Sequence, residues 1–131
     1  MRFFTPEWFE GGCPPVPEYE EYLEGIRLPA AIDEHFSLHD AQVIRIVYIE
    51  KSHDRGVVHL FLDTRHSTTK AKEVVFTGAR LLLEGAVEGA WWIGEEFDVV
   101  QDGYRMDAMT VDGKTDTYSF LTIAFRDMVL R

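Results

Sequence analysis

Apolar and polar positions follow two different periods along this chain, and the change falls near residue 37. From residue 41 onward they alternate with a period of two, which is typical of strands that bury one face. Before residue 37 the apolar positions recur at helical spacing in short runs. The pattern predicts six strands, at about 41–51, 57–64, 73–83, 90–100, 104–111 and 117–127.

Turn signals separate several of these strands. Asp102-Gly103 and Asp112-Gly113 are typical of tight hairpin turns, and we also predict a hairpin at His53-Asp54-Arg55-Gly56. Strands that follow one another through hairpins predict one antiparallel meander.

The first third of the chain predicts short helices. Thr5 is a suitable N-cap, Pro6 suits the first helical position, and Phe4 and Phe9 could pack across the cap. A second helix is expected from Glu18 to Gly25, and residues 30–36 are the candidate for a third short one.

We therefore predict an α+β fold in a single domain of residues 1–131. Residues 1–37 would form a helical N-terminal segment with two or three short helices. Residues 38–131 would form a single antiparallel sheet of about six strands, on which these helices pack.

Charge suggests the kind of partner. The net charge is -10, and residues 1–40 hold nine acidic and two basic residues. This argues against nucleic-acid binding, because phosphates need lysine and arginine, and favours a basic protein partner. The alternative is that the acidic surface only keeps a small protein soluble.

Sequence features also suggest a compartment. Cys13 is the single cysteine, so no disulfide can form within the chain. The start lacks the apolar core of a signal peptide, and the apolar runs are too short to span a membrane. We expect a cytoplasmic protein with no membrane association.

The most polar candidate site is Leu38-His39-Asp40, where helical spacing gives way to strand spacing. His35 and His39, four apart, could ligate a metal together with His53, His59 or His66. The alternative, which we favour, is that His39 and Asp40 hold the start of the first strand by hydrogen bonds.

Two further features could form a binding site. Glu95 and Glu96 are adjacent, so on a strand they point to opposite faces, whereas Glu96 and Asp98 share a face at a reach that could serve acid–base chemistry. Trp91 and Trp92 also point to opposite faces, and the outward ring could anchor a partner. The alternatives are a solvated strand face and core packing.

Three segments form a recognisable pattern: Arg2-Phe3-Phe4-Thr5-Pro6-Glu7-Trp8, Leu38-His39-Asp40-Ala41-Gln42-Val43 and Gly89-Ala90-Trp91-Trp92-Ile93-Gly94-Glu95-Glu96. Together they resemble a known family of small uncharacterised bacterial proteins, a domain of unknown function. The resemblance implies no activity and no residue roles. The Leu-His-Asp start of a strand meander also resembles small immunity-type proteins that neutralise toxins.

The functional hypothesis is a non-enzymatic, acidic protein-binding module, of which an immunity protein would be one form. Its candidate binding residues are His39, Asp40, Trp91, Trp92 and Glu96; we assign no catalytic residue, no metal ligand and no cofactor. The alternative is a small metal-binding protein or hydrolase that uses His39 and Asp40. The chain could be a monomer, or a homodimer that pairs strand edges or exposed aromatic surface.

Overall fold

The computed structural model describes residues 1–52 and 55–131. Within these ranges two helices, α1 (Pro6–Glu10) and α2 (Pro17–Glu24), precede seven strands. The strands are β1 (Gln42–Ser52), β2 (Arg55–Asp63), β3 (Glu73–Glu84), β4 (Trp91–Val100), β5 (Gly103–Asp112), β6 (Thr117–Phe125) and β7 (Asp127–Leu130).

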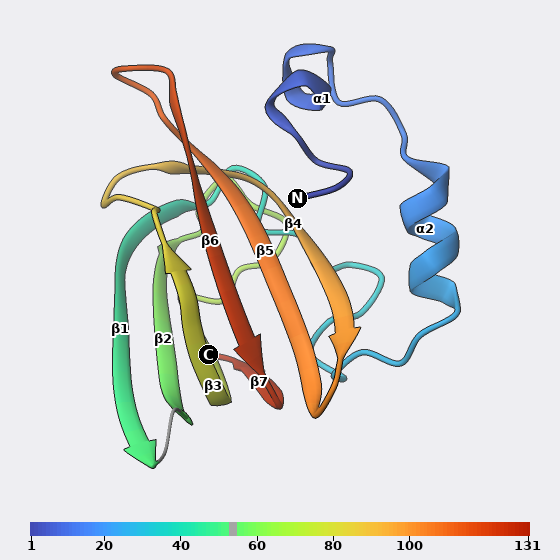
Figure 1. Cartoon of the computed structure of the whole chain (residues 1–131). Helices are drawn as coiled ribbons and strands as arrows, with labels where there is room; N and C mark the ends of the chain where they lie inside the picture. Colours follow the sequence, from blue (N-terminus) through green and yellow to red (C-terminus); the bar gives the residue numbers. More distant parts are fainter. Residues whose placement is uncertain (53–54) are drawn as a thin grey trace.

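Six of the strands close into an antiparallel barrel. Around the ring β1 pairs with β2, β2 with β3, β3 with β6, β6 with β5, β5 with β4, and β4 again with β1. The seventh, β7, pairs with the first part of β3. Figure 1 shows β1, β2 and β3 on one side, with β4, β5 and β6 side by side on the other.

The predicted α+β fold with an open meander is wrong in two respects. First, β3 pairs with β6 instead of β4, and β4 pairs with β1, so the sheet is closed. The strands run to 12 residues and several carry β-bulges, which increase twist and let a sheet curl until its ends meet. Alternation of apolar residues does not show which strand ends will pair.

Second, the helical content is smaller than predicted. The expected third helix at residues 30–36 is a pair of turns, in which the Ile32 N–H bonds the Pro29 carbonyl and the Phe36 N–H bonds the Asp33 carbonyl. The Asp33 side chain also accepts a hydrogen bond from the His35 N–H at 2.8 Å. Such local side-chain bonds compete with helix formation, and a segment this short gains little from helix propagation.

The strand ranges themselves agree with the sequence pattern to within two residues. The last predicted strand ends two residues early, at Phe125, and after a break at Arg126 the chain continues as β7. There the Arg126 N–H bonds the Thr77 carbonyl at 3.0 Å, next to Gly78 with a φ of 55°. The hairpin predicted at residues 53–56 includes residues 53 and 54, which lie outside the described residues.

The core fills the barrel. Its completely buried members are Leu38, Ala41, Val58, Leu60, Val74, Phe76, Ala79, Met106, Ala108, Leu121 and Ile123, with Leu62, Trp92 and Phe125 at 1% exposure. Leu38 belongs to this core although it precedes the first strand. The residues leading into β1 are therefore part of the barrel and not only a connection to it.

Both helices lie beside β4, outside the barrel (Figure 1). Helix α1 begins as predicted, because the Thr5 side chain accepts a hydrogen bond from the Trp8 N–H at 3.2 Å and Pro6 follows the cap. The predicted Phe4–Phe9 contact is replaced: Phe4 packs on Trp8 with ring centroids 4.7 Å apart, and Phe9 packs on Tyr118 of β6. Neither helix of the described ranges has the length and apolar character needed to cross a membrane.

Leu38→Ala should lower the free energy of unfolding by about 3 kcal/mol, because it empties a fully buried site in the barrel core. Urea unfolding followed by tryptophan fluorescence measures this loss. Leu82→Ala is the matched control, since the Leu82 side chain is 48% exposed and its removal should change stability by about 0.5 kcal/mol or less. Equal losses in the two variants would contradict a core role for Leu38.

Candidate functional site

The barrel is closed between β1 and β4 by a short seam. The two strands align only Gln42 with Trp91 as partners, and the remaining bonds come from residues around them. The Trp92 N–H donates to the Ala41 carbonyl at 2.7 Å, and the Asp40 N–H donates to the Trp92 carbonyl at 3.0 Å. Beyond this seam β1 and β4 diverge, and the rest of the β4 edge faces the N-terminal segment.

Leu38-His39-Asp40 forms the corner that leads into the seam. Asp40 has a φ of 68°, a left-handed conformation that aspartate tolerates better than most residues, and the Ala41 N–H closes the turn on the Leu38 carbonyl. His39 Nδ1 lies 2.6 Å from the Ile93 carbonyl oxygen. Because a carbonyl can only accept, Nδ1 carries the proton and donates it, and Nε2 lies 3.5 Å from Asp40 Oδ1.

Glu96 holds the start of the chain against β4. Its side chain is only 7% exposed, and it accepts hydrogen bonds from the backbone N–H groups of Arg2 (3.0 Å), Phe3 and Phe4 (3.0 Å). A buried carboxylate needs such donors to replace water.

Helix α2 is tied to the same strand by two tyrosines. The Tyr19 hydroxyl accepts a hydrogen bond from the Phe97 N–H at 2.7 Å, and the Tyr22 hydroxyl donates to Asp98. Burial raises the pKa of Tyr19, and the hydrogen bond to Asp98 raises that of Tyr22. Both hydroxyls therefore stay protonated. Their hydrogen bonds cover this part of the β4 edge with side chains in place of a neighbouring strand.

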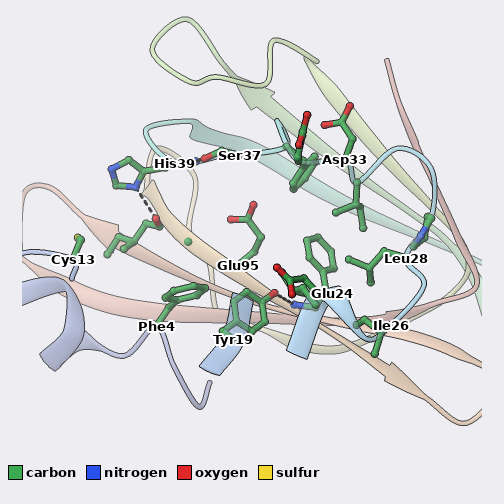
Figure 2. A pocket seen from close by; sticks show the side chains of 18 of the residues that line it. Phe4, Cys13, Tyr19, Glu24, Ile26, Leu28, Asp33, Ser37, His39 and Glu95 are labelled. Atoms are coloured by element: carbon green, nitrogen blue, oxygen red, sulfur yellow. Dashed lines mark hydrogen bonds between the residues drawn. The ribbon is translucent and has the colours of Figure 1, made fainter. Parts of the chain in front are cut away.

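A pocket of about 740 Å³ lies between α2, the connection at 25–38 and the β4 edge. In Figure 2 the Glu95 carboxyl group stands among the pocket residues, with Phe4 and Tyr19 on one side and Asp33 and His39 on others. The apolar part of the lining is Phe4, Trp8, Tyr19, Leu23, Ile26, Leu28, Pro29, Ala30, Ile32, Phe36, Ile93 and Phe97. Its size and apolar walls are those of a small-molecule site.

Glu95 is the titratable group that the pocket perturbs. Glu95 is half-buried where it lines the pocket. This desolvation raises the pKa of its carboxyl group above the ordinary 4.5. The Trp92 indole N–H, which donates to Glu95 Oε2 at 3.0 Å, the Leu38 backbone amide and the charge of His39 act in the opposite direction. Burial is the largest of these effects, so the pKa of Glu95 is raised on balance.

The structure separates the residues predicted from the sequence. His39 lines the pocket, whereas Asp40 is exposed beside it. Trp92 is in the core, Glu96 binds the N-terminal backbone, and Trp91 is 37% exposed and lies next to Gly113, away from the pocket lining. These residues do not converge on one site.

Glu95 was missed as a site residue. The sequence does carry a signal for it, because Ile93, Glu95 and Phe97 share the period of a strand face, and an acid between two apolar residues of one face is unusual. The β-bulge between Trp92 and Gly94, which brings the Trp92 indole to Glu95, could not be predicted from the alternation of apolar and polar residues.

The metal hypothesis has no support among the described residues, where no group of three or more His, Cys, Asp or Glu side chains could hold an ion. His35 is exposed beside Glu34, and His59 pairs with Glu73 at 2.7 Å. His53 lies outside the described residues.

Comparisons with known proteins found no match to a family model, to a curated protein or to a solved structure. The resemblance to the uncharacterised bacterial family stays a prediction.

Glu96→Ala should release the N-terminal segment, because it leaves three backbone N–H groups without their acceptor. We expect a loss of about 2 kcal/mol in the free energy of unfolding and faster cleavage before α1 by a protease. The control is Glu88→Ala, at an exposed position. Cleavage of Glu96→Ala at the parent rate would contradict the anchoring role.

Glu95→Gln should stabilise the protein in a pH-dependent way. Since the folded-state pKa of Glu95 is raised, the parent is favoured below pH 4.5, and that advantage is lost as pH rises through the folded-state pKa. The variant lacks this titration, so its stability relative to the parent should rise above pH 4.5 and then level off. Unfolding in urea across pH 4–9 measures the difference, with Glu84→Gln as the exposed control. A constant difference would contradict the raised pKa.

Proposed function

We propose that this protein is a non-enzymatic binding module for a basic protein partner, which contacts the face formed by α2 and the connection at 25–38. The observation that carries the proposal is the gathering of carboxylates on this face. Those of α2 are exposed, at Glu18, Glu20, Glu21 and Glu24, and Asp33 and Glu34 continue them across the pocket mouth. Such a surface accelerates encounter with a positively charged protein.

The anchoring of α2 supports this proposal. A helix of eight residues is marginal by itself, but Tyr19 and Tyr22 attach it to β4. Its carboxylates are therefore presented from a fixed position. A partner that binds them spends little free energy on ordering the helix.

The contacts of His39 fit a role in holding the corner that leads into β1. Its Nδ1 is committed to the Ile93 carbonyl, and its Nε2 faces Asp40. One observation favours the alternative of a hydrolase: Glu95, a carboxyl group with a raised pKa, lines the same pocket as His39. An immunity protein, whose partner is a toxin, is one form of the binding role, and a cytoplasmic location fits it.

Charge reversal tests the binding role. Glu18→Lys, Glu20→Lys and Glu21→Lys together should weaken capture of basic proteins from a bacterial lysate by at least about tenfold, and capture by the parent should weaken as salt is raised. Quantitative mass spectrometry of the captured proteins at two salt concentrations measures both effects.

The matched control combines Glu50→Lys, Glu84→Lys and Glu88→Lys. These positions are exposed and outside the pocket lining, and the change in net charge is the same. Equal loss in the two triple variants would mean that net charge alone governs the interaction. Capture that is insensitive to salt would contradict the proposal.

A further inference from the structure

The pocket beside β4 combines a half-buried carboxyl group with aromatic walls. The carboxyl group is that of Glu95 in β4. Phe97, the next residue on the same face of β4, belongs to the core. Phe4 and Tyr19 lie to one side of the Glu95 carboxyl group (Figure 2), and Phe36 is a third aromatic residue of the lining. The Trp92 indole N–H donates a hydrogen bond of 3.0 Å to the Glu95 carboxyl group and so fixes the position of that group.

Apart from His39, the ionisable groups that give the pocket lining its charge are carboxyl groups. Besides Glu95 they are Glu24 of α2 and Asp33 and Glu34 of the 25–38 connection. Among the described residues, the lining includes no lysine or arginine, and its one histidine, His39, is held by Ile93. An anionic ligand would meet four carboxyl groups here, whereas a cation would meet carboxylates and the faces of aromatic rings.

We propose that this pocket binds a small amphiphilic amine, with its ammonium group beside Glu95 and its apolar part against the aromatic and aliphatic walls. The volume of about 740 Å³ accommodates a molecule of this class. The inference goes beyond the proposed function, because it requires no protein partner and rests on the pocket interior instead of the outer carboxylates of α2.

The ammonium group would also offset the cost of placing a carboxylate in this pocket. A bound cation favours the ionised form of Glu95, so binding should release a proton where the free protein is protonated at this site. The other titratable groups facing the pocket are Tyr19, Cys13, Glu24, Asp33, Glu34 and His39. Comparison with a Glu95 variant separates its contribution from theirs.

The test uses 4-phenylbutylamine, with 4-phenylbutanol and 4-phenylbutyrate as neutral and anionic controls of the same shape. Titrations are followed by the amide and indole resonances of the ¹⁵N-labelled full chain at pH 7. The amine should shift the Trp92 indole and Phe97 amide resonances, and should bind at least about tenfold more tightly than the alcohol. Alcohol or carboxylate binding as tightly as the amine would overturn the proposal, as would no binding.

Glu95→Gln should weaken amine binding by about tenfold and leave binding of the alcohol unchanged, while Glu84→Gln should change neither. The glutamine keeps the shape of the side chain and an oxygen for the Trp92 indole, so the fold should persist. A second measurement needs no variant: affinity of the parent for the amine should rise with pH from 4.5 upward. If the affinity for the amine changed neither with Glu95→Gln nor with pH, the role of Glu95 would be overturned.

A lysine side chain of a partner protein is another source of the same ammonium chemistry. A short peptide carrying one internal lysine, titrated in the same way, distinguishes the two sources. Binding of the peptide without binding of 4-phenylbutylamine would overturn the small-molecule proposal. The triple charge reversal on α2 should leave 4-phenylbutylamine binding within about twofold, so the result is independent of the protein-partner hypothesis.

Discussion

Closure of the barrel depends on the short backbone seam between residues 40–43 and residues 89–92. In it the N–H groups of Asp40, Val43 and Trp92 donate to the carbonyls of Trp92, Ala90 and Ala41. Leu38 on one side of the seam and Trp92 on the other are both buried in the barrel core. The two halves of the ring are therefore joined where the corner Leu38-His39-Asp40 meets the first residues of β4.

The shortness of the seam has a direct structural consequence. Because β1 leaves β4 after so few residues, much of the β4 edge has no strand beside it. Unpaired strand edges are costly when buried and prone to aggregation when exposed. Here Tyr19 satisfies the Phe97 N–H and His39 satisfies the Ile93 carbonyl, while Glu96 and Asp98 draw the N-terminal segment and α2 onto the strand.

The pocket follows from the same arrangement. A neighbouring strand would bring its backbone within about 5 Å of β4, whereas a helix held by tyrosine side chains stands farther away and leaves space. The inward side chain of Glu95 reaches into that space. The connection at 25–38 lines the pocket with Asp33 and Glu34, so one geometric cause accounts for the pocket, its half-buried carboxyl group and its acidic lining.

The sequence by itself determined the local features of this protein, because they depend on neighbours along the chain. Period-two alternation placed the six barrel strands to within two residues, and Thr5 and Pro6 marked the start of α1. Ring closure was decided only by the tertiary structure, since it depends on accumulated twist and on which strand ends meet. So were the roles of single acids: Glu96 became an anchor because the N-terminal backbone reaches it, and Glu95 became the pocket carboxyl because a bulge and a diverging strand enclose it.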